Sequence, residues 1–417
     1  MGIANDIAAL NGVYRKRYAR DVAMAIPDGT ILLDEFGFDS ANALGEDWNE
    51  PVSLTSENGF TLVEAEGANS PLINEPIAGT TKNANVNSPQ IYLQSEVNYE
   101  AASRAMRKGE AAIVRAINHV IRNNTESHRR CQESQIFHGQ VDLGVVESST
   151  STTIVISKAT WAPGPWAGRE GLLIDVQDAT LANELDQDIS ITSINFSTRT
   201  LTCDAVNNGA VIAGTRVFMK DACIAGSPAT FREPVGIHAA LTATSSVYGI
   251  NPSTYTLWDA GSVSASSDTL DFDHSTEAVA RVAEKGGMGL LLQIVNPHSF
   301  NDLIGDQAAL RSYDEDGSTA MYRTGARAIR FFTGNGEVSV RPSIYQKRGF
   351  AFVLDGKCWS RKGSQDFSFS SPFSTEAFHV YEAKGGAFAR SFSSTTPFCR
   401  LLARNALISG IVDSVAN

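Results

Sequence analysis

The residue types that most often perform catalysis occur in this sequence without the spacing that such chemistry requires. Gly356 and Lys357 resemble the end of a phosphate-binding loop, but Cys358 follows where Ser or Thr is needed, and the upstream glycine is missing. The patterns of a serine nucleophile elbow, a paired-histidine zinc helix and a glycine-rich dinucleotide loop are also missing. The sequence therefore indicates no acyl-transfer, phosphoryl-transfer or hydrolytic site.

Two acidic segments offer oxygen ligands for a metal ion, and neither completes a ligand set. Residues 312–317 begin like a calcium loop, but the twelfth position is Arg323 instead of a bidentate glutamate. Residues 271–274 contain two aspartates and a histidine. We interpret Asp273 as the cap of a helix that starts near Ser275. The sequence thus predicts no bound metal ion.

The remaining ionisable residues show no paired arrangement. The seven histidines lack paired ligand spacing, and His128 and His138, near the end of a basic segment, are expected to be exposed. Carboxylate pairs such as Glu64 and Glu66 lie in exposed strand or loop contexts, where nothing separates an acid from a base in pKa. We therefore predict a protein that is not an enzyme, without catalytic residues or a cofactor.

The charge balance excludes further function classes. With 34 Lys and Arg against 46 Asp and Glu, the chain carries a net charge of −12. An acidic surface repels nucleic-acid phosphates and anionic membranes, so it argues against a sequence-specific reader of DNA and a membrane-surface protein. Apolar runs such as residues 288–295 are far shorter than the roughly 20 residues that cross a bilayer. The N-terminus also lacks a signal-peptide pattern.

The cysteines indicate a reducing compartment. They are odd in number and form no Cys-x-x-Cys pair, at positions 131, 203, 223, 358 and 399. We expect reduced thiols in a cytosol-made protein, each serving as a small core residue.

The first expected element is a basic helix. Residues 5–26 carry apolar side chains three and four positions apart, and Pro27 ends the segment. Its basic residues are Arg15, Lys16, Arg17 and Arg20. They form either a solvated helix face or an arm that docks on an acidic neighbour.

Residues 96–138 contain the clearest helix signal, a continuous apolar stripe with a 3.6-residue period. Such a helix would be about 60 Å long. Basic residues recur every seven positions on its polar side: Lys108, Arg115, Arg122 and Arg129. This stripe is either a solvated face or a surface that pairs with acidic groups of neighbouring subunits, such as Glu64 and Glu66.

Residues 49–93 alternate apolar and polar side chains between prolines, which predicts strands and turns. Asn58 and Gly59 lie between two such runs and give the strongest short hairpin signal. Because a long polar hairpin has little to pack on within its own chain, we expect it to pack on another molecule.

The second half of the chain changes character twice. Residues 141–225 contain short β-branched runs separated by turn residues, which predicts an inserted all-β module, a small barrel or sandwich. After Pro228, helices are expected at 275–285 and 297–310, with strands at 288–295 and beyond. The interleaving lacks regular βαβ spacing, so the fold class is α+β.

This order of segments resembles the major capsid proteins of tailed bacteriophages, the Hong Kong 97 fold. The resemblance covers the whole chain and is one of pattern. The similar segments are WNEPVSLTSENGFTL (48–62), YEAASRAMRKGEAAIVRAI (99–117), IVNPHSFNDLI (294–304), GFAFVLDGKCWSRKGSQDFSF (349–369) and the tail that contains Pro397.

The resemblance implies a division of the chain into named parts. These are an N-terminal arm (1–48), an extended loop (49–94), a peripheral domain with the spine helix (95–140), an all-β insertion domain (141–226), a return to the peripheral domain (227–274), an axial domain (275–389) and a C-terminal peripheral strand (390–417). Some members crosslink a loop lysine to an asparagine of another subunit. Lys82 lies in the corresponding segment, but no flanking carboxylate is identifiable.

The implied function is a phage head that assembles from hexamers and pentamers in the host cytoplasm and encloses double-stranded DNA. Its main partner is the chain itself, with scaffolding, portal and decoration proteins as further partners and DNA held without specificity. Two alternatives stay open. One is the shell of a non-viral compartment, as in encapsulins, and the other is a binding protein whose β module recognises a receptor or a glycan.

Overall fold

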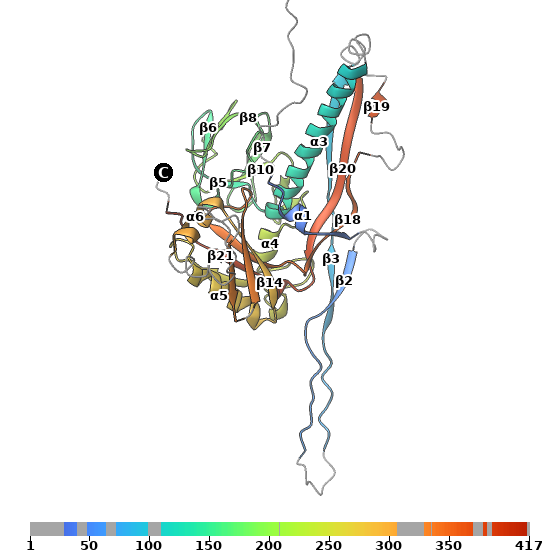
Figure 1. Cartoon of the computed structure of the whole chain (residues 1–417), viewed down its shortest axis with the longest axis vertical. Helices are drawn as coiled ribbons and strands as arrows, with labels where there is room; N and C mark the ends of the chain where they lie inside the picture. Colours follow the sequence, from blue (N-terminus) through green and yellow to red (C-terminus); the bar gives the residue numbers. More distant parts are fainter. Residues whose placement is uncertain are drawn as a thin grey trace, which may run out of the picture.

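The computed structural model describes residues 29–39, 48–63, 72–98, 110–207, 209–306, 329–334, 336–369, 378–381 and 386–414. Within these residues the chain forms two mixed or antiparallel sheets, a closed barrel and a long two-stranded ribbon. Figure 1 shows the ribbon extending far beyond the rest of the molecule. The arrangement confirms the α+β class.

The first sheet supports the long helix. Its strands are β1 (Phe38–Asp39), β18 (Trp359–Ser368), β20 (Gly386–Cys399), β19 (Phe378–Tyr381) and β4 (Gln90–Asn98). β18, β19 and β4 all pair antiparallel with β20, and β1 pairs parallel with β18. Helix α3 (Glu110–His138) runs alongside β20 (Figure 1). The short helix α1 (Leu32–Glu35) packs against α3.

The long helix is shorter than its sequence pattern predicted. Residues up to Asn98 belong to strand β4, so the predicted start at Glu96 is wrong, and residues 99–109 lie outside the described part. The apolar period continues from β4 towards the helix because β4 also buries one face, and periodicity alone does not separate the two.

The second sheet has the order β13 (Gly261–Ser264), β21 (Ala406–Ser409), β17 (Phe350–Asp355), β14 (Gly289–Val295), β16 (Gly336–Pro342) and β15 (Ile329–Thr333). Helices α5 (Phe272–Glu284) and α6 (Pro297–Gly305) pack against it and bury Val279, Val282 and Leu303 in its core. A second core lies between this sheet, α3 and helix α4 (Ile237–Thr242). Short 3₁₀ turns occur at η1 (Lys158–Thr160), η2 (Thr256–Trp258) and η3 (Leu402–Arg404).

Helix α5 begins earlier than expected. Asp271 is its N-cap, and the Asp271 carboxylate accepts a hydrogen bond from the backbone N–H of His274 at 2.8 Å. The capping role assigned to Asp273 is therefore wrong, and Asp273 lies in the first helical turn. Helix α6 likewise ends at Gly305, before the predicted Leu310.

The β-rich module is a closed barrel. Its strands, in the order β10 (Arg216–Met219), β5 (Gly144–Ser149), β6 (Thr153–Ile156), β9 (Thr200–Cys203), β8 (Glu184–Asn195) and β7 (Leu173–Gln177), enclose an aliphatic core. A small ribbon of β11 (Cys223–Ile224) and β12 (Thr230–Phe231) follows it. The Arg130 guanidinium of α3 donates hydrogen bonds to the carbonyls of Gly164 and Ala167, which fastens the barrel to the helix.

Several strands belong to a different sheet from the one that the predicted domain limits imply. Strand β13 lies in the 227–274 segment, yet it pairs with β21 in the second sheet. Strands β18 and β19 lie within 275–389 but belong to the first sheet, and β21 lies within 390–417 but belongs to the second. These pairings join strands far apart in sequence, so composition changes along the chain do not mark them.

His128 and His138 are both fully buried, contrary to the exposure predicted for them. The His128 ring lies between two serine hydroxyls of β20, with Nδ1 3.0 Å from Ser391 Oγ and Nε2 2.6 Å from Ser393 Oγ. Burial lowers the pKa of His128 to about 4, although the Asp366 carboxylate opposes this shift. The histidine is therefore neutral where the helix meets the sheet.

Acid should weaken this contact. Because the pKa of His128 is lower in the folded than in the unfolded chain, its contribution to stability is complete above about pH 6.5 and is lost as the pH falls towards 4. We expect His128→Gln to show a shallower loss of stability over this window, measured by urea unfolding at several pH values. Equal pH slopes for the two proteins would contradict the assignment.

Candidate assembly interface

The ribbon is the feature of the fold that most needs a partner. Strand β2 (Trp48–Ser53) pairs antiparallel with β3 (Thr81–Val86), and the pairing continues outward to a bridge between Asn58 and Ile77. Farther out, the Asn74 side-chain amide donates to the carbonyl of Phe60 at 2.8 Å. Asn58 and Gly59 therefore lie within a ladder, and the prediction that they form the hairpin turn is wrong.

The outer part of this ribbon presents apolar side chains to solvent. Their exposed fractions are 96% for Leu62, 93% for Leu72, 79% for Phe60 and 78% for Ile73, and Val63 and Ile77 are also exposed. We call these six residues the ribbon tip. Single exposed apolar residues are ordinary, but six within two short stretches of one projecting ribbon, 60–63 and 72–77, are a concentration that favours a protein interface.

Two glycines allow the strands of the ribbon to approach each other. A Cβ at Gly79 would lie 2.7 Å from the carbonyl oxygen of Thr55, and one at Gly59 would lie 2.6 Å from that of Glu75. Gly59 also has a φ of +103°, which side-chain-bearing residues rarely adopt. The sequence therefore specifies a narrow ribbon along its projecting length.

The root of the ribbon is anchored in the protein core. Alternate residues of β2 point inward, so Trp48 and Val52 are buried; the buried residues of β3 are Val86, opposite Trp48, and Ala84, opposite Glu50. Between the two buried apolar residues of β2 lies Glu50, which also faces inward. A carboxylate on the buried side of a strand needs a cationic partner.

Lys362 of β18 supplies that partner. Its ammonium is 1% exposed and lies 2.6 Å from Glu50 Oε1 and 2.6 Å from Asp39 Oδ2. The largely exposed Arg400 reaches the same Glu50 at 3.1 Å. Burial acts to raise the pKa of Glu50, but the hydrogen bonds and charges of Lys362 and Arg400 outweigh it and hold this pKa below its ordinary value. The cluster ties β2, β1 and β18 together.

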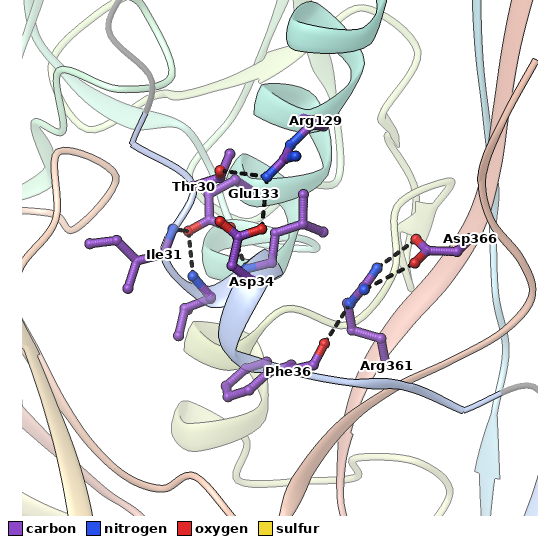
Figure 2. A network of polar contacts seen from close by, with 10 residues as sticks. Thr30, Ile31, Asp34, Phe36, Arg129, Glu133, Arg361 and Asp366 are labelled. Atoms are coloured by element: carbon purple, nitrogen blue, oxygen red, sulfur yellow. Dashed lines mark hydrogen bonds and ion pairs between the residues drawn. The ribbon is translucent and has the colours of Figure 1, made fainter.

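A second polar network fastens the segment that leads out of the N-terminal residues (Figure 2). The buried Glu133 carboxylate on α3 accepts hydrogen bonds from the backbone N–H groups of Ile31, Leu32 and Leu33 at 2.8–2.9 Å. Burial raises the pKa of Glu133 to about 7, although these three donors act in the opposite direction. One helical turn earlier, Arg129 bonds to the same segment.

Arg361 completes the network from the sheet side. Its guanidinium donates to the carbonyl of Phe36 at 2.9 Å and forms a two-pronged pair with Asp366 at 2.6 and 3.0 Å. Figure 2 shows Arg129 beside the start of the segment that carries α1 and Arg361 beside its end, at Phe36. Residues 30–36 are therefore held by the helix and by the sheet together.

Of the residues predicted to contact neighbouring subunits, few lie in the described part. Outside it are Arg15, Lys16, Arg17, Arg20, Glu64, Glu66 and Lys108. Arg115 lies on α3, in a stretch whose side chains are not described, and Arg122 is exposed on the same helix. Arg129 pairs within its own chain, with Asp34 at 2.7 Å and Thr30 at 3.2 Å. Lys82 is exposed on β3.

The buried charges Glu50, Glu133 and Lys362 were not predicted from the sequence. Only Glu50 could have been found from the sequence, because it shares one face of a predicted strand with the apolar residues Trp48 and Val52. Within the described residues, no group of three His, Cys, Asp or Glu side chains is placed to hold a metal ion. No helix in the described ranges is long and apolar enough to cross a membrane.

No protein-family model matches the sequence, and no curated protein matches it. Solved structures do match its fold. The capsid of cyanophage A-1(L) superposes with a TM-score of 0.58 at 9% identity, covering 96% of this chain and 98% of that chain. The chain has the Hong Kong 97-like capsid fold. Capsids of native and empty GTA particles give TM-scores of 0.53 and 0.50 at 10% and 11% identity. They cover 99% and 98% of this chain and all of their own.

The geometry described above is consistent with this capsid fold. The ribbon projects from a body made of a long helix on a sheet, a second sheet and a barrel, and the two polar networks hold its root and the entry of the N-terminal segment. The two most exposed large apolar side chains of the described residues, Leu62 and Leu72, lie on the projecting ribbon.

The loss in the free energy of unfolding should depend on which cation of the cluster at the ribbon root is removed. Lys362→Met leaves Glu50 buried beside Asp39 without its main partner, so we expect a loss of about 3 kcal/mol in the free energy of unfolding. Arg400→Met removes an exposed partner of the same carboxylate and should cost less than about 1 kcal/mol. Urea unfolding measures both. Equal losses would show that Lys362 does not organise the cluster.

The ribbon glycines give a second prediction. Gly79→Ala places a methyl group against the Thr55 carbonyl and should spread the strands, while the core of the subunit stays intact. We expect faster amide hydrogen exchange in residues 53–61 and 74–81 with an unchanged midpoint of thermal unfolding. Gly37→Ala is the matched control, because nothing lies within 4 Å of its Cβ position. Unchanged exchange in the Gly79 variant would contradict the close approach.

Proposed function

We propose that this chain is the major capsid protein of a tailed phage, a structural protein that assembles with copies of itself into hexamers and pentamers of an icosahedral head enclosing double-stranded DNA. The observation that carries the proposal is a long ribbon with an apolar tip on a capsid fold. A two-stranded ribbon is marginally stable alone, and its tip residues gain stability when they pack on another subunit. The cyanophage and GTA structures that share this fold are capsids.

We assign the roles implied by the resemblance to the two sheets as they are formed, and these do not follow the predicted limits at 275 and 389. The sheet of β18, β20 and β4 with α3 is the peripheral domain, and the six-stranded sheet with α5 and α6 is the axial domain. The ribbon is the extended loop, and the barrel is an insertion domain. The buried hydrogen bonds from Arg130 to the carbonyls of Gly164 and Ala167 favour a barrel that is rigidly attached to helix α3.

The charge of the chain supports a container for DNA. A net charge of −12 keeps packaged phosphates from adhering to the wall, because like charges repel across a shell of many subunits. Basic residues of the N-terminal segment and of α3 would then pair with acidic residues of neighbouring subunits. Among the described residues of α3, Arg122 is an exposed example. Each exposed pair contributes about 0–1 kcal/mol, and a closed shell repeats it many times.

Electron microscopy of the expressed protein tests the assembly claim. Closed polyhedral shells, or rings of six and five subunits, are the expected result. A compartment shell would give the same particles, so the phage assignment is tested by whether antibodies to the protein label the heads of tailed virions. A stable monomer with hydrolase activity would overturn the proposal.

The tip residues should control assembly without controlling folding. In the double variant Leu62→Ser with Leu72→Ser, both side chains are almost fully exposed, so circular dichroism and thermal unfolding of the subunit should match the wild type. Shell yield in sedimentation should fall at least tenfold. Glu57→Gln, an exposed change on the same ribbon, should assemble normally. Normal shell yield in the double variant would show that the tip is not an interface.

A further inference from the structure

The chain passes between its two sheets at two places, and these crossings meet. It leaves the second sheet at Asp355, turns through residues 356–358 and enters β18 at Trp359. It returns from the end of β20, at Cys399, to β21 at Ala406. Trp359 and Cys399 are directly opposite each other in the β18–β20 ladder. Both connections therefore lie side by side.

The buried amide of Asn405 organises this junction. Asn405 Oδ1 accepts hydrogen bonds from the backbone N–H of Asp355 at 3.0 Å and from Trp359 Nε1 at 2.8 Å. Asn405 Nδ2 donates to the carbonyl of Leu402 at 3.0 Å and points at Cys399 Sγ at 3.4 Å. One side chain thus fixes the outgoing and the returning connection.

Two of the five free thiols meet at the same junction. Cys358 Sγ donates to Asp355 Oδ2 at 3.1 Å, and the Cys399 thiol lies close enough to raise the pKa of Cys358. Cys399 is buried in the core and Cys358 packs against that core while remaining partly exposed. Cys399 pairs with Trp359 in the ladder and Cys358 directly precedes Trp359, so the folded chain holds the two cysteines next to each other.

We propose that Cys358 and Cys399 are a modification site that forms an intramolecular disulfide with a small-molecule disulfide oxidant such as oxidised glutathione. The Cys358 thiolate attacks one glutathione sulfur and releases the first reduced glutathione. Cys399 then attacks the Cys358 sulfur of the mixed disulfide and releases the second. The two thiols lose two electrons and two protons, and the oxidant is reduced to two thiols.

The environment sets the order and the speed of these steps. Cys358 reacts first because it is the more exposed of the two. The neighbouring Cys399 thiol, burial and the Asp355 carboxylate all raise the pKa of Cys358 far above its ordinary value, so its thiolate is scarce. The bond therefore forms slowly at neutral pH and faster in mild alkali.

The resulting bond would join the two connections between the sheets. It closes a loop of about forty residues that contains β18, β19 and most of β20, and so restricts the unfolded chain. A reducing cytoplasm keeps the thiols free, and oxidising surroundings outside the cell would close the bond. This inference does not depend on the proposed capsid role.

The experiment uses the folded full-length chain with oxidised glutathione in mild alkali. We expect an intact mass lower by two hydrogen atoms, a peptide that links Cys358 to Cys399, and a rise of several degrees in the midpoint of thermal unfolding, all reversed by dithiothreitol. Cys399→Ser should instead retain one glutathione on Cys358. Cys131→Ser, on α3, should react like the wild type.

Three results would overturn the proposal. The first is that no mass change occurs in the folded protein, and the second is that the crosslink joins other cysteines. The third is that the bond forms only after unfolding in urea. Because the reaction is read by mass on wild-type protein, a variant that fails to fold does not affect the outcome.

Discussion

A two-stranded ribbon has one ladder of hydrogen bonds and no second layer, so it cannot cover its own apolar side chains. This constraint explains which part of the ribbon is buried and which part is exposed. The part of the ribbon next to the body packs Trp48, Val52 and Val86 into the main core. The outer part leaves Leu62 and Leu72 exposed to solvent. A subunit built in this way is stable at the root and incomplete at the tip.

The buried polar groups have a common role, which is to join segments that are distant in sequence. Lys362 holds β2 and β1 against β18, and Glu133 holds residues 31–33 against α3. His128 does the same between α3 and β20. Each group loses hydration on burial, and aliphatic residues of the same size would pack as tightly. The polar groups instead accept only one alignment of partners, so they fix how the segments sit.

The sequence was sufficient for the class, the long helix and the β-rich module, because hydrophobic periodicity is local. It was insufficient where a distant partner decides the environment. His128 lies on a basic helix and was expected in solvent, yet the serines of β20 that cover it are more than 250 positions away. Asn58 and Gly59 carry a turn signal, but Ile77 pairs with Asn58 and extends the ladder beyond them. The strand exchange between the sheets has no local signature at all.

The rigid root of the ribbon has a mechanical consequence. At the rise of an extended chain, residues 53–63, which continue outward from β2, span about 30 Å, so the ribbon acts as a lever whose pivot is the Lys362 cluster. A rotation of a few degrees at the pivot displaces the tip by more than an ångström. The stiffness of this cluster of four charged side chains therefore limits how far the outer ribbon can swing relative to the body of the protein.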